Sequence, residues 1–231
     1  MSGRTIKKVL ITFDLNKTLL YAYKKSKVQH FNDLRLLENI QPSDQVEGYN
    51  LYFRNGRPEL LNYLFMESSD LYQVGVWSSL DADFTGHFAK SFFGRYYRNL
   101  AFVIATNRIE YEGNLKQVSV EPLQIKRNFH QIQDKFPGYE HNNIMMVSNY
   151  KNLIDEYTSN DIILNKFDPL IIGNSFTVDF SLLALVKYLR GMRVFVTKKN
   201  IEDIRPMMQA KHFNTMIGRV NNTATNYTEY R

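Results

Sequence analysis

The sequence predicts an α/β protein of three layers, α/β/α, in which a central, mostly parallel sheet lies between helices. Apolar, β-prone runs alternate along the chain with amphipathic segments, and a strand, a helix and another strand in succession favour parallel pairing. Several runs end in polar residues, as strands do where a ligand crevice forms at their carboxyl ends. The chain has 231 residues, 44% of them apolar, which is enough for one sizeable core.

The first expected strand begins at Val9 and ends where it delivers Asp14. The next, over 49–54, alternates apolar and polar side chains, and the turn residues 55–58 follow it. Pro58 is well placed to start a helix over 59–66, which has helical apolar spacing. A buried strand is expected over 72–79, because its apolar run ends in two hydroxyl residues.

The second half of the chain continues the alternation. Residues 83–93 have a helical pattern, and 102–105 form a short β-prone run. An amphipathic helix is expected over 123–136 because Pro137 and Gly138 would stop it. The apolar run 143–149 predicts another core strand, and the strongly apolar segment 180–189 predicts a buried helix.

This pattern predicts one domain over residues 1–190 with two additions. Residues 21–50 are mixed, polar and lysine-rich at their start, and we expect them to form a flap insertion. Residues 191–231 become polar toward their end, and we expect a C-terminal extension or tail.

The run around Asp14 carries the clearest chemical signal. Side chains alternate along an extended segment, so Asp14 and Asn16 can face the same way, with Thr18 two residues further on. An aspartate in this position can attack phosphorus, and a second acid two residues later can transfer protons. The amide of Asn16 holds geometry but has no useful proton to exchange. A buried strand followed by a polar turn explains the same residues equally well.

Three predicted strands end in polar side chains that should meet at one edge of the sheet. They are Asp14 to Asn16, then Ser78 with Ser79, and finally Ser148 with Asn149.

The order of several short motifs resembles the haloacid dehalogenase superfamily. It is most similar to the branch of phosphatases that act on the RNA polymerase II C-terminal tail, which includes the receptor subunit of the mitochondrial presequence translocase. The resemblance covers about residues 8–190. The motifs that carry it are Phe13-Asp14-Leu15 with Thr18-Leu19, Arg57-Pro58, Val76-Trp77-Ser78-Ser79, and Val120 with Pro122-Leu123.

Carried over by position, the resemblance implies that Asp14 matches the nucleophile, Thr18 the hydroxyl after it, and Ser78 a phosphoryl-binding hydroxyl. Four departures weaken that chemistry. Asn16 replaces the acid/base, Glu121 replaces a lysine, and Ser148 and Asn149 replace acidic Mg²⁺ ligands. Lys116 and Lys126 are the alternative candidates for the lysine. Because these groups carry most of phosphoryl-transfer catalysis, we expect an inactive, pseudoenzyme member that needs no cofactor.

The expected role is therefore an interaction or scaffold subunit whose partners are other proteins of a larger complex. The alternative is a weak Mg²⁺-dependent protein phosphatase, or a phosphopeptide-binding module, that uses Asp14. Only that alternative calls for Mg²⁺.

The composition limits which classes of partner and which cell compartments are expected. The net charge is +6, but basic residues are scattered among acidic ones, so no nucleic-acid partner is expected. The chain has no cysteine, which excludes thiolate metal sites and a cysteine nucleophile. We expect no transmembrane segment, contact with a membrane surface only through partners, and no cleavable presequence before the first strand. By analogy with the translocase branch we favour a mitochondrial assembly, with the cytosol or nucleus as alternatives.

Overall fold

The computed structural model describes most of the chain from Lys8 to Phe213. The described residues are 8–24, 40–105, 108–111, 114–117, 129–150, 160–169, 179–199, 202–210 and 213. Within these residues, no helix is long and apolar enough to cross a membrane.

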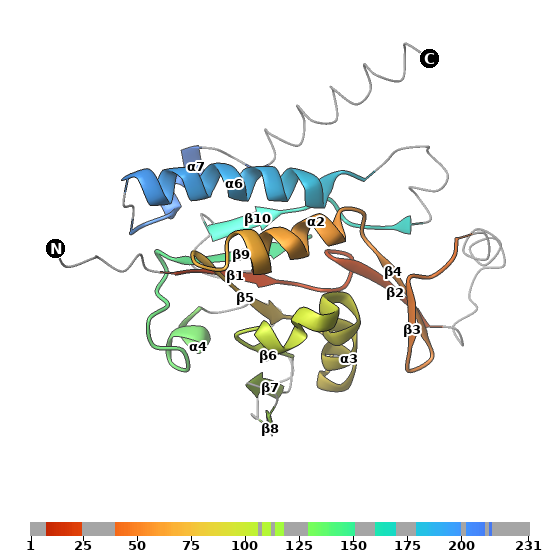
Figure 1. Ribbon diagram of the computed structural model, residues 1–231. Coiled ribbons are helices and arrows are strands. Elements are labelled where there is room, and N and C mark those ends of the chain that lie inside the picture. The colour runs from red at the N-terminus through yellow and green to blue at the C-terminus, as the bar shows by residue number, and fades with distance from the viewer. Residues whose placement is uncertain are drawn as a thin grey trace, which may run out of the picture.

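A seven-stranded sheet forms the centre of the molecule (Figure 1). Its order is β10-β9-β1-β5-β6-β7-β8, with parallel pairing from β10 to β6 and antiparallel pairing from β6 to β8. The strands are β1 (Val9–Phe13), β5 (Tyr72–Trp77), β6 (Val103–Ile104), β7 (Arg108–Tyr111), β8 (Asn114–Gln117), β9 (Ile144–Ser148) and β10 (Asp161–Ile163). The predicted mostly parallel sheet is confirmed.

Helices cover both faces of this sheet, so the predicted three-layer arrangement is also confirmed. One face carries α2 (Arg57–Asn62) with a π-helical turn η1 (Tyr63–Glu67), α3 (Ala82–Phe93) and α6 (Ser181–Lys199), whose apolar side chains share one core with β1 and β5. A second core on the other face includes Leu10, Phe129 and Ile132, and is covered by α4 (His130–Gln133). A 3-10 turn, η2 (Gly94–Asn99), follows α3.

Strand β1 lies at the centre because both of its faces are apolar. Val9, Ile11 and Phe13 face the core beneath the three helices, and Leu10 faces the core beneath α4. Each of these four side chains is at most 2% exposed. The one polar side chain of the strand, Thr12, is also fully buried and donates to the Met145 carbonyl at 3.2 Å. The strand therefore turns no polar group toward water, which favours burial between two helical layers.

A second, antiparallel sheet lies beside the carboxyl ends of the central strands, at the right of Figure 1. Its order is β2-β4-β3, formed by β2 (Leu20–Lys24), β3 (Asp44–Val46) and β4 (Tyr49–Phe53). Leu51 and Phe53 turn toward the core, where Phe53 packs edge-on against Phe92 of α3. The flap insertion predicted over 21–50 thus begins and ends in strands, and residues 25–39 between them lie outside the described part.

The structure corrects the boundary predicted at residue 190, which falls inside α6. The helix continues nine residues past that point, to Lys199, and its buried face reaches Val196, since Met192 and Val196 are each 2% exposed. After α6, the short helix α7 (Arg205–Ala210) places Met208 in the same core. Part of the region predicted as an extension is therefore core of the domain.

Of the residues predicted to form a helix over 123–136, those from 123 to 128 lie outside the described part, and the described ones include the short helix α4. Phe129 and Ile132, both fully buried, anchor α4 to the core. The chain then turns through Pro137 and Gly138, where Gly138 has a φ of 113° that disfavours any side chain.

Alkaline pH is expected to destabilise the fold through two buried tyrosines, Tyr72 of β5 and Tyr188 of α6. Burial raises the pKa of Tyr72 above its usual range and that of Tyr188 to about 12. A phenol that holds its proton more tightly when folded stabilises the protein fully below about pH 10, and this stabilisation is lost as the pH rises through about 12. Each such tyrosine steepens the loss by up to about 1.4 kcal/mol per pH unit. Thermal unfolding measured at several pH values between about 9 and 11.5 checks this.

The control is Tyr188→Phe, which removes one of the two phenols. Its unfolding temperature should fall less steeply with pH than that of the unchanged chain. Equal slopes for both proteins would contradict the assignment.

Candidate functional site

Asp14 is placed at the carboxyl edge of the sheet by the pairing of β1. Its backbone N–H donates to the Val147 carbonyl at 3.0 Å, which continues the parallel pairing with β9 one residue beyond β1. The carboxylate is almost fully enclosed, with the residue 2% exposed. The sequence therefore delivers one buried acid to the place where ligands bind in such sheets.

The loop after Asp14 folds tightly around a single carbonyl. The N–H groups of Thr18, Leu19 and Leu20 lie 2.9–3.2 Å from the Leu15 oxygen. Lys17 adopts a left-handed conformation, with a φ of 61°, and its N–H donates to the Leu20 carbonyl. This compact loop fixes where the Thr18 side chain lies.

Thr18 joins two strand ends. Its Oγ1 lies 3.0 Å from Oδ1 of Asn149, at the end of β9, and 3.4 Å from Oδ2 of Asp14. A hydroxyl has one proton to donate, and the shorter contact is to the amide oxygen. The predicted convergence of strand ends is thus seen for Asp14, Thr18 and Asn149.

Asn16 lies in the loop between β1 and β2, the latter a strand of the small antiparallel sheet. Its side-chain Oδ1 accepts from the Ala22 N–H at 3.4 Å, and its backbone forms a bridge with Leu20. Both partners belong to β2, so Asn16 joins the loop after Asp14 to the start of that strand, as asparagine side chains often do in turns. The residue that stands in place of a second acid thus helps to hold the loop.

The three predicted serines reach the same edge, and two of them bond to their own turns. Ser78 accepts from the Leu80 N–H at 3.2 Å and is 2% exposed. The Ser148 hydroxyl donates to the Tyr150 carbonyl at 2.9 Å, and its oxygen lies 3.3 Å from the Tyr150 N–H. Ser79 is exposed. The described hydrogen bonds of Ser78 and Ser148 therefore stabilise the strand ends themselves.

Three other candidates are not placed by the structure. Glu121 and Lys126 lie outside the described residues, and for Lys116 only the backbone, in β8, is described. Among the described residues, no group of three or more histidine, aspartate or glutamate side chains could hold a metal ion. Mg²⁺ binds one or two carboxylates plus other oxygens, and the described strand ends offer the Asp14 carboxylate with the neutral Asn149 amide.

The sequence did not identify Arg54 as part of the site, although its buried side chain contacts the loop after Asp14. Its side chain is 1% exposed and donates to three parts of the chain: Thr18 O at 2.8 Å, Asn165 O at 2.7 Å and Asp179 Oδ2 at 2.5 Å. Burial lowers the pKa of Arg54, and the charge of Asp179 opposes that shift. A charged residue directly after the apolar run of β4 was the available signal.

Asp179 connects this pair to α6. Its second oxygen accepts from the Ser181 N–H at 2.9 Å, at the start of the helix, and Arg54 also donates to the Ser181 hydroxyl at 2.9 Å. The Asp14 loop, the segment after β10 and the beginning of α6 are thus tied to one guanidinium group.

Lys17 was also missed as a charged member of the Asp14 loop. The Phe167 N–H donates to the Lys17 carbonyl at 2.8 Å, which brings the residues after β10 against the loop. Burial lowers the pKa of Lys17, the nearby charge of Lys166 lowers it further, and Asp168 opposes this. Its ammonium group lies 5.9 Å from the centre of the Tyr21 ring.

The comparisons with known proteins give matches among solved structures. No family model matches the chain, and no curated protein does. Among solved structures, Fcp1, an essential RNA polymerase II CTD phosphatase, is similar with 14% identity and a TM-score of 0.47 over 85% of this chain and 54% of that one. A substituted form of fission yeast Fcp1 bound to beryllium fluoride is similar with 11% identity and a TM-score of 0.44, over 99% of this chain and 68% of that one.

This chain thus spans about half the length of the first of those structures. Similarity at these values does not assign the chain to a family.

Proposed function

We propose that this chain is a catalytically inactive, phosphatase-like domain that serves as an interaction subunit of a larger protein assembly. One observation carries the proposal: the two amides at the strand ends, Asn16 and Asn149, both take part in hydrogen bonds that hold the loops around Asp14. The resemblance of the motifs to phosphatases places acidic residues at these two positions.

Loss of proton transfer is the first argument. After a carboxylate attacks phosphorus, an acid must protonate the leaving oxygen and then activate water, a contribution of roughly 10²–10⁴-fold in rate. Asn16 has no titratable proton, and its oxygen already accepts from Ala22. Asp14 therefore lacks the proton-transferring acid that this chemistry requires at position 16.

Loss of positive charge is the second argument. Phosphoryl transfer depends on cations that neutralise the transferring group. In the described part of the site, Arg54 is directed at backbone carbonyls and Asp179, and the ammonium group of Lys17 lies 5.9 Å from the centre of the Tyr21 ring. Mg²⁺ would find one carboxylate there, that of Asp14. A phosphate dianion would thus meet the buried carboxylate of Asp14 without the metal that would offset its charge.

A phosphatase assay tests the proposal directly. The full chain is incubated with an aryl phosphate in the presence of Mg²⁺ and compared with Asp14→Asn. We expect release of aryl alcohol at the rate of buffer alone for both proteins, because neither has a complete set of catalytic groups. Turnover by the unchanged chain that disappears in Asp14→Asn would refute the proposal.

Metal binding gives a second, independent readout. Mg²⁺ at millimolar concentration should leave the unfolding temperature of the chain unchanged, because a ligand stabilises only the fold that binds it. An Asn149→Asp variant, which restores a second carboxylate, is the matched comparison and should gain stability with Mg²⁺. A Mg²⁺-dependent rise in the unchanged chain would count against inactivity.

The assembly role and a mitochondrial location rest on the motif resemblance. Purification of the intact chain from its source in mild detergent and low salt tests the first, and fractionation tests the second. A stable set of copurifying subunits supports the proposal. A monomer that releases phosphate from a protein substrate contradicts it.

A further inference from the structure

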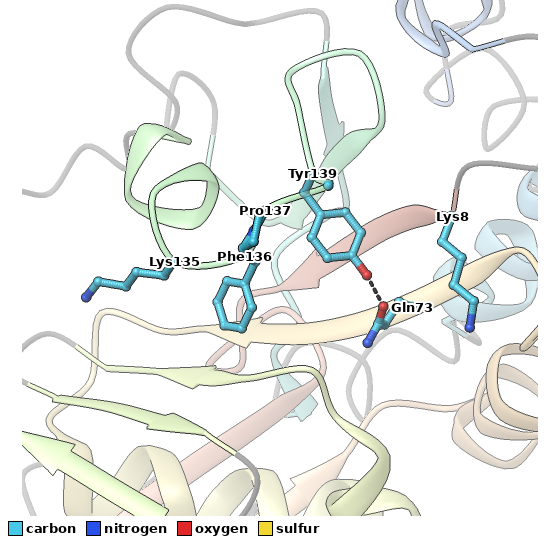
Figure 2. A pocket seen from close by; sticks show the side chains of 7 residues that line it. Lys8, Gln73, Lys135, Phe136, Pro137 and Tyr139 are labelled. Carbon is cyan, nitrogen blue, oxygen red and sulfur yellow. Dashed lines mark hydrogen bonds between the residues drawn. The ribbon is translucent and has the colours of Figure 1, made fainter.

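A pocket of about 370 Å³ lies at the opposite edge of the sheet from Asp14. It is lined by Lys8, before β1, by Gln73 of β5 and by the segment from Lys135 to Tyr139 after α4 (Figure 2). A strand residue advances about 3.3 Å, so the passage along β1 from Lys8 to Asp14 separates the two places by roughly 20 Å. The pocket is therefore distinct from the candidate site.

One wall of the pocket is apolar and rigidly packed. Phe136 lies against Phe102 of the core, with ring centres 4.8 Å apart, and Tyr139 packs against the same core. Pro137 and Gly138 connect them, and the left-handed φ of Gly138 allows the chain to turn there. Such a wall suits a flat ring, since aromatic rings attract one another in offset-stacked and edge-to-face arrangements.

The groups of the pocket that can donate to a ligand are the side-chain nitrogens of Lys8, Gln73 and Lys135. The Tyr139 hydroxyl donates to Oε1 of Gln73, as Figure 2 shows, so the amide nitrogen is the Gln73 group left to meet a ligand. Burial raises the pKa of Tyr139 to about 12, so the hydroxyl keeps this proton beyond the pH at which an ordinary tyrosine loses it. Lys8 and Lys135 lie at opposite ends of the pocket, and none of the described residues that line it is acidic.

We propose that this pocket binds a small organic anion of the aryl carboxylate class. The carboxylate is held by the ammonium group of Lys8 and the amide nitrogen of Gln73, and the ring lies against Phe136 and Pro137. Lys8 also donates to Ser69 O at 3.3 Å, which holds its side chain at the rim while leaving other N–H groups to donate. A volume of this size fits a metabolite-sized ligand.

Titration calorimetry with three probes tests the proposal on the full chain. Indole-3-acetate carries both the ring and the charge, indole-3-acetamide carries the ring alone, and acetate carries the charge alone. We expect saturable binding of indole-3-acetate with a Kd of about 1 mM or tighter. The amide should bind about fivefold more weakly, as expected for loss of an exposed charge pair, and acetate should not saturate.

Variants locate the binding. Lys8→Gln should weaken indole-3-acetate about fivefold, whereas Lys90→Gln, on the exposed side of α3, should leave it unchanged. Tyr139→Phe removes the hydroxyl that orients Gln73 and should also weaken binding. The proposal is overturned if indole-3-acetate does not saturate at about 10 mM. Equal affinity for the amide, or equal effects of the two lysine variants, would overturn it as well.

Discussion

Replacing Arg54 with methionine is expected to lower the free energy of unfolding by about 3–5 kcal/mol, because it leaves the buried Asp179 carboxylate without its charge partner. The pair is only 1% and 10% exposed at its two side chains, so water cannot replace the lost contact. For a domain of this length the unfolding temperature should fall by roughly 10 °C. Calorimetry of the purified variant measures this.

The matched control is Arg190→Met, which breaks an ion pair with Glu67 whose side chains are 57% and 42% exposed. An exposed pair contributes about 1 kcal/mol or less, so this variant should unfold near the temperature of the unchanged chain. The double variant Arg54→Met, Asp179→Asn should recover part of the loss, because no buried charge is left alone. Equal effects of the two arginine variants would show that the buried pair does not hold the loops together.

Replacing Gly75 with alanine is expected to destabilise the protein by about 1–3 kcal/mol through overpacking. A Cβ atom at this position of β5 would lie 2.5 Å from Cζ of Phe102, well inside van der Waals contact. The Phe102 ring is 1% exposed and packs against Phe136, so it has little room to move away. Chemical denaturation of the variant gives the free energy directly.

Gly191→Ala provides the comparison for the same chemical change. This glycine lies inside α6, and an added Cβ would meet nothing within 4 Å. Alanine in a helix interior is favoured over glycine by roughly 0.5–1 kcal/mol, so this variant should be more stable than the unchanged chain. If both alanine variants shifted stability in the same direction, the close approach of Phe102 would not be the cause.

The elements with strong apolar patterns were predicted from the sequence because their signal is local. The strand that begins at Val9 is apolar on both faces, and the helix after Pro58 has a start signal and helical spacing. The meeting of Asp14 and Asn149 also followed, because the carboxyl ends of parallel strands share one edge. For these elements and this contact, the order of residues along the chain was enough for the prediction.

Other elements escaped prediction because their stability comes from distant contacts. Strand β10 has only three residues and forms by pairing with β9. The course of α6 past residue 190 depends on Met192 and Val196 packing onto the core. In the sequence, Arg54 is indistinguishable from an ordinary surface arginine. Its burial is explained by the ion pair with Asp179, which lies 125 residues later in the chain.

The sequence by itself determined that one acid, Asp14, stands at a strand end without a second acid two residues on, since residue identity needs no fold. The tertiary structure decided what the replacements do: Asn16 caps a loop, Asn149 holds Thr18, and Arg54 ties that loop to α6. The reason is that side-chain chemistry is local, whereas the hydrogen-bond partners of buried polar groups are supplied by segments far away along the chain.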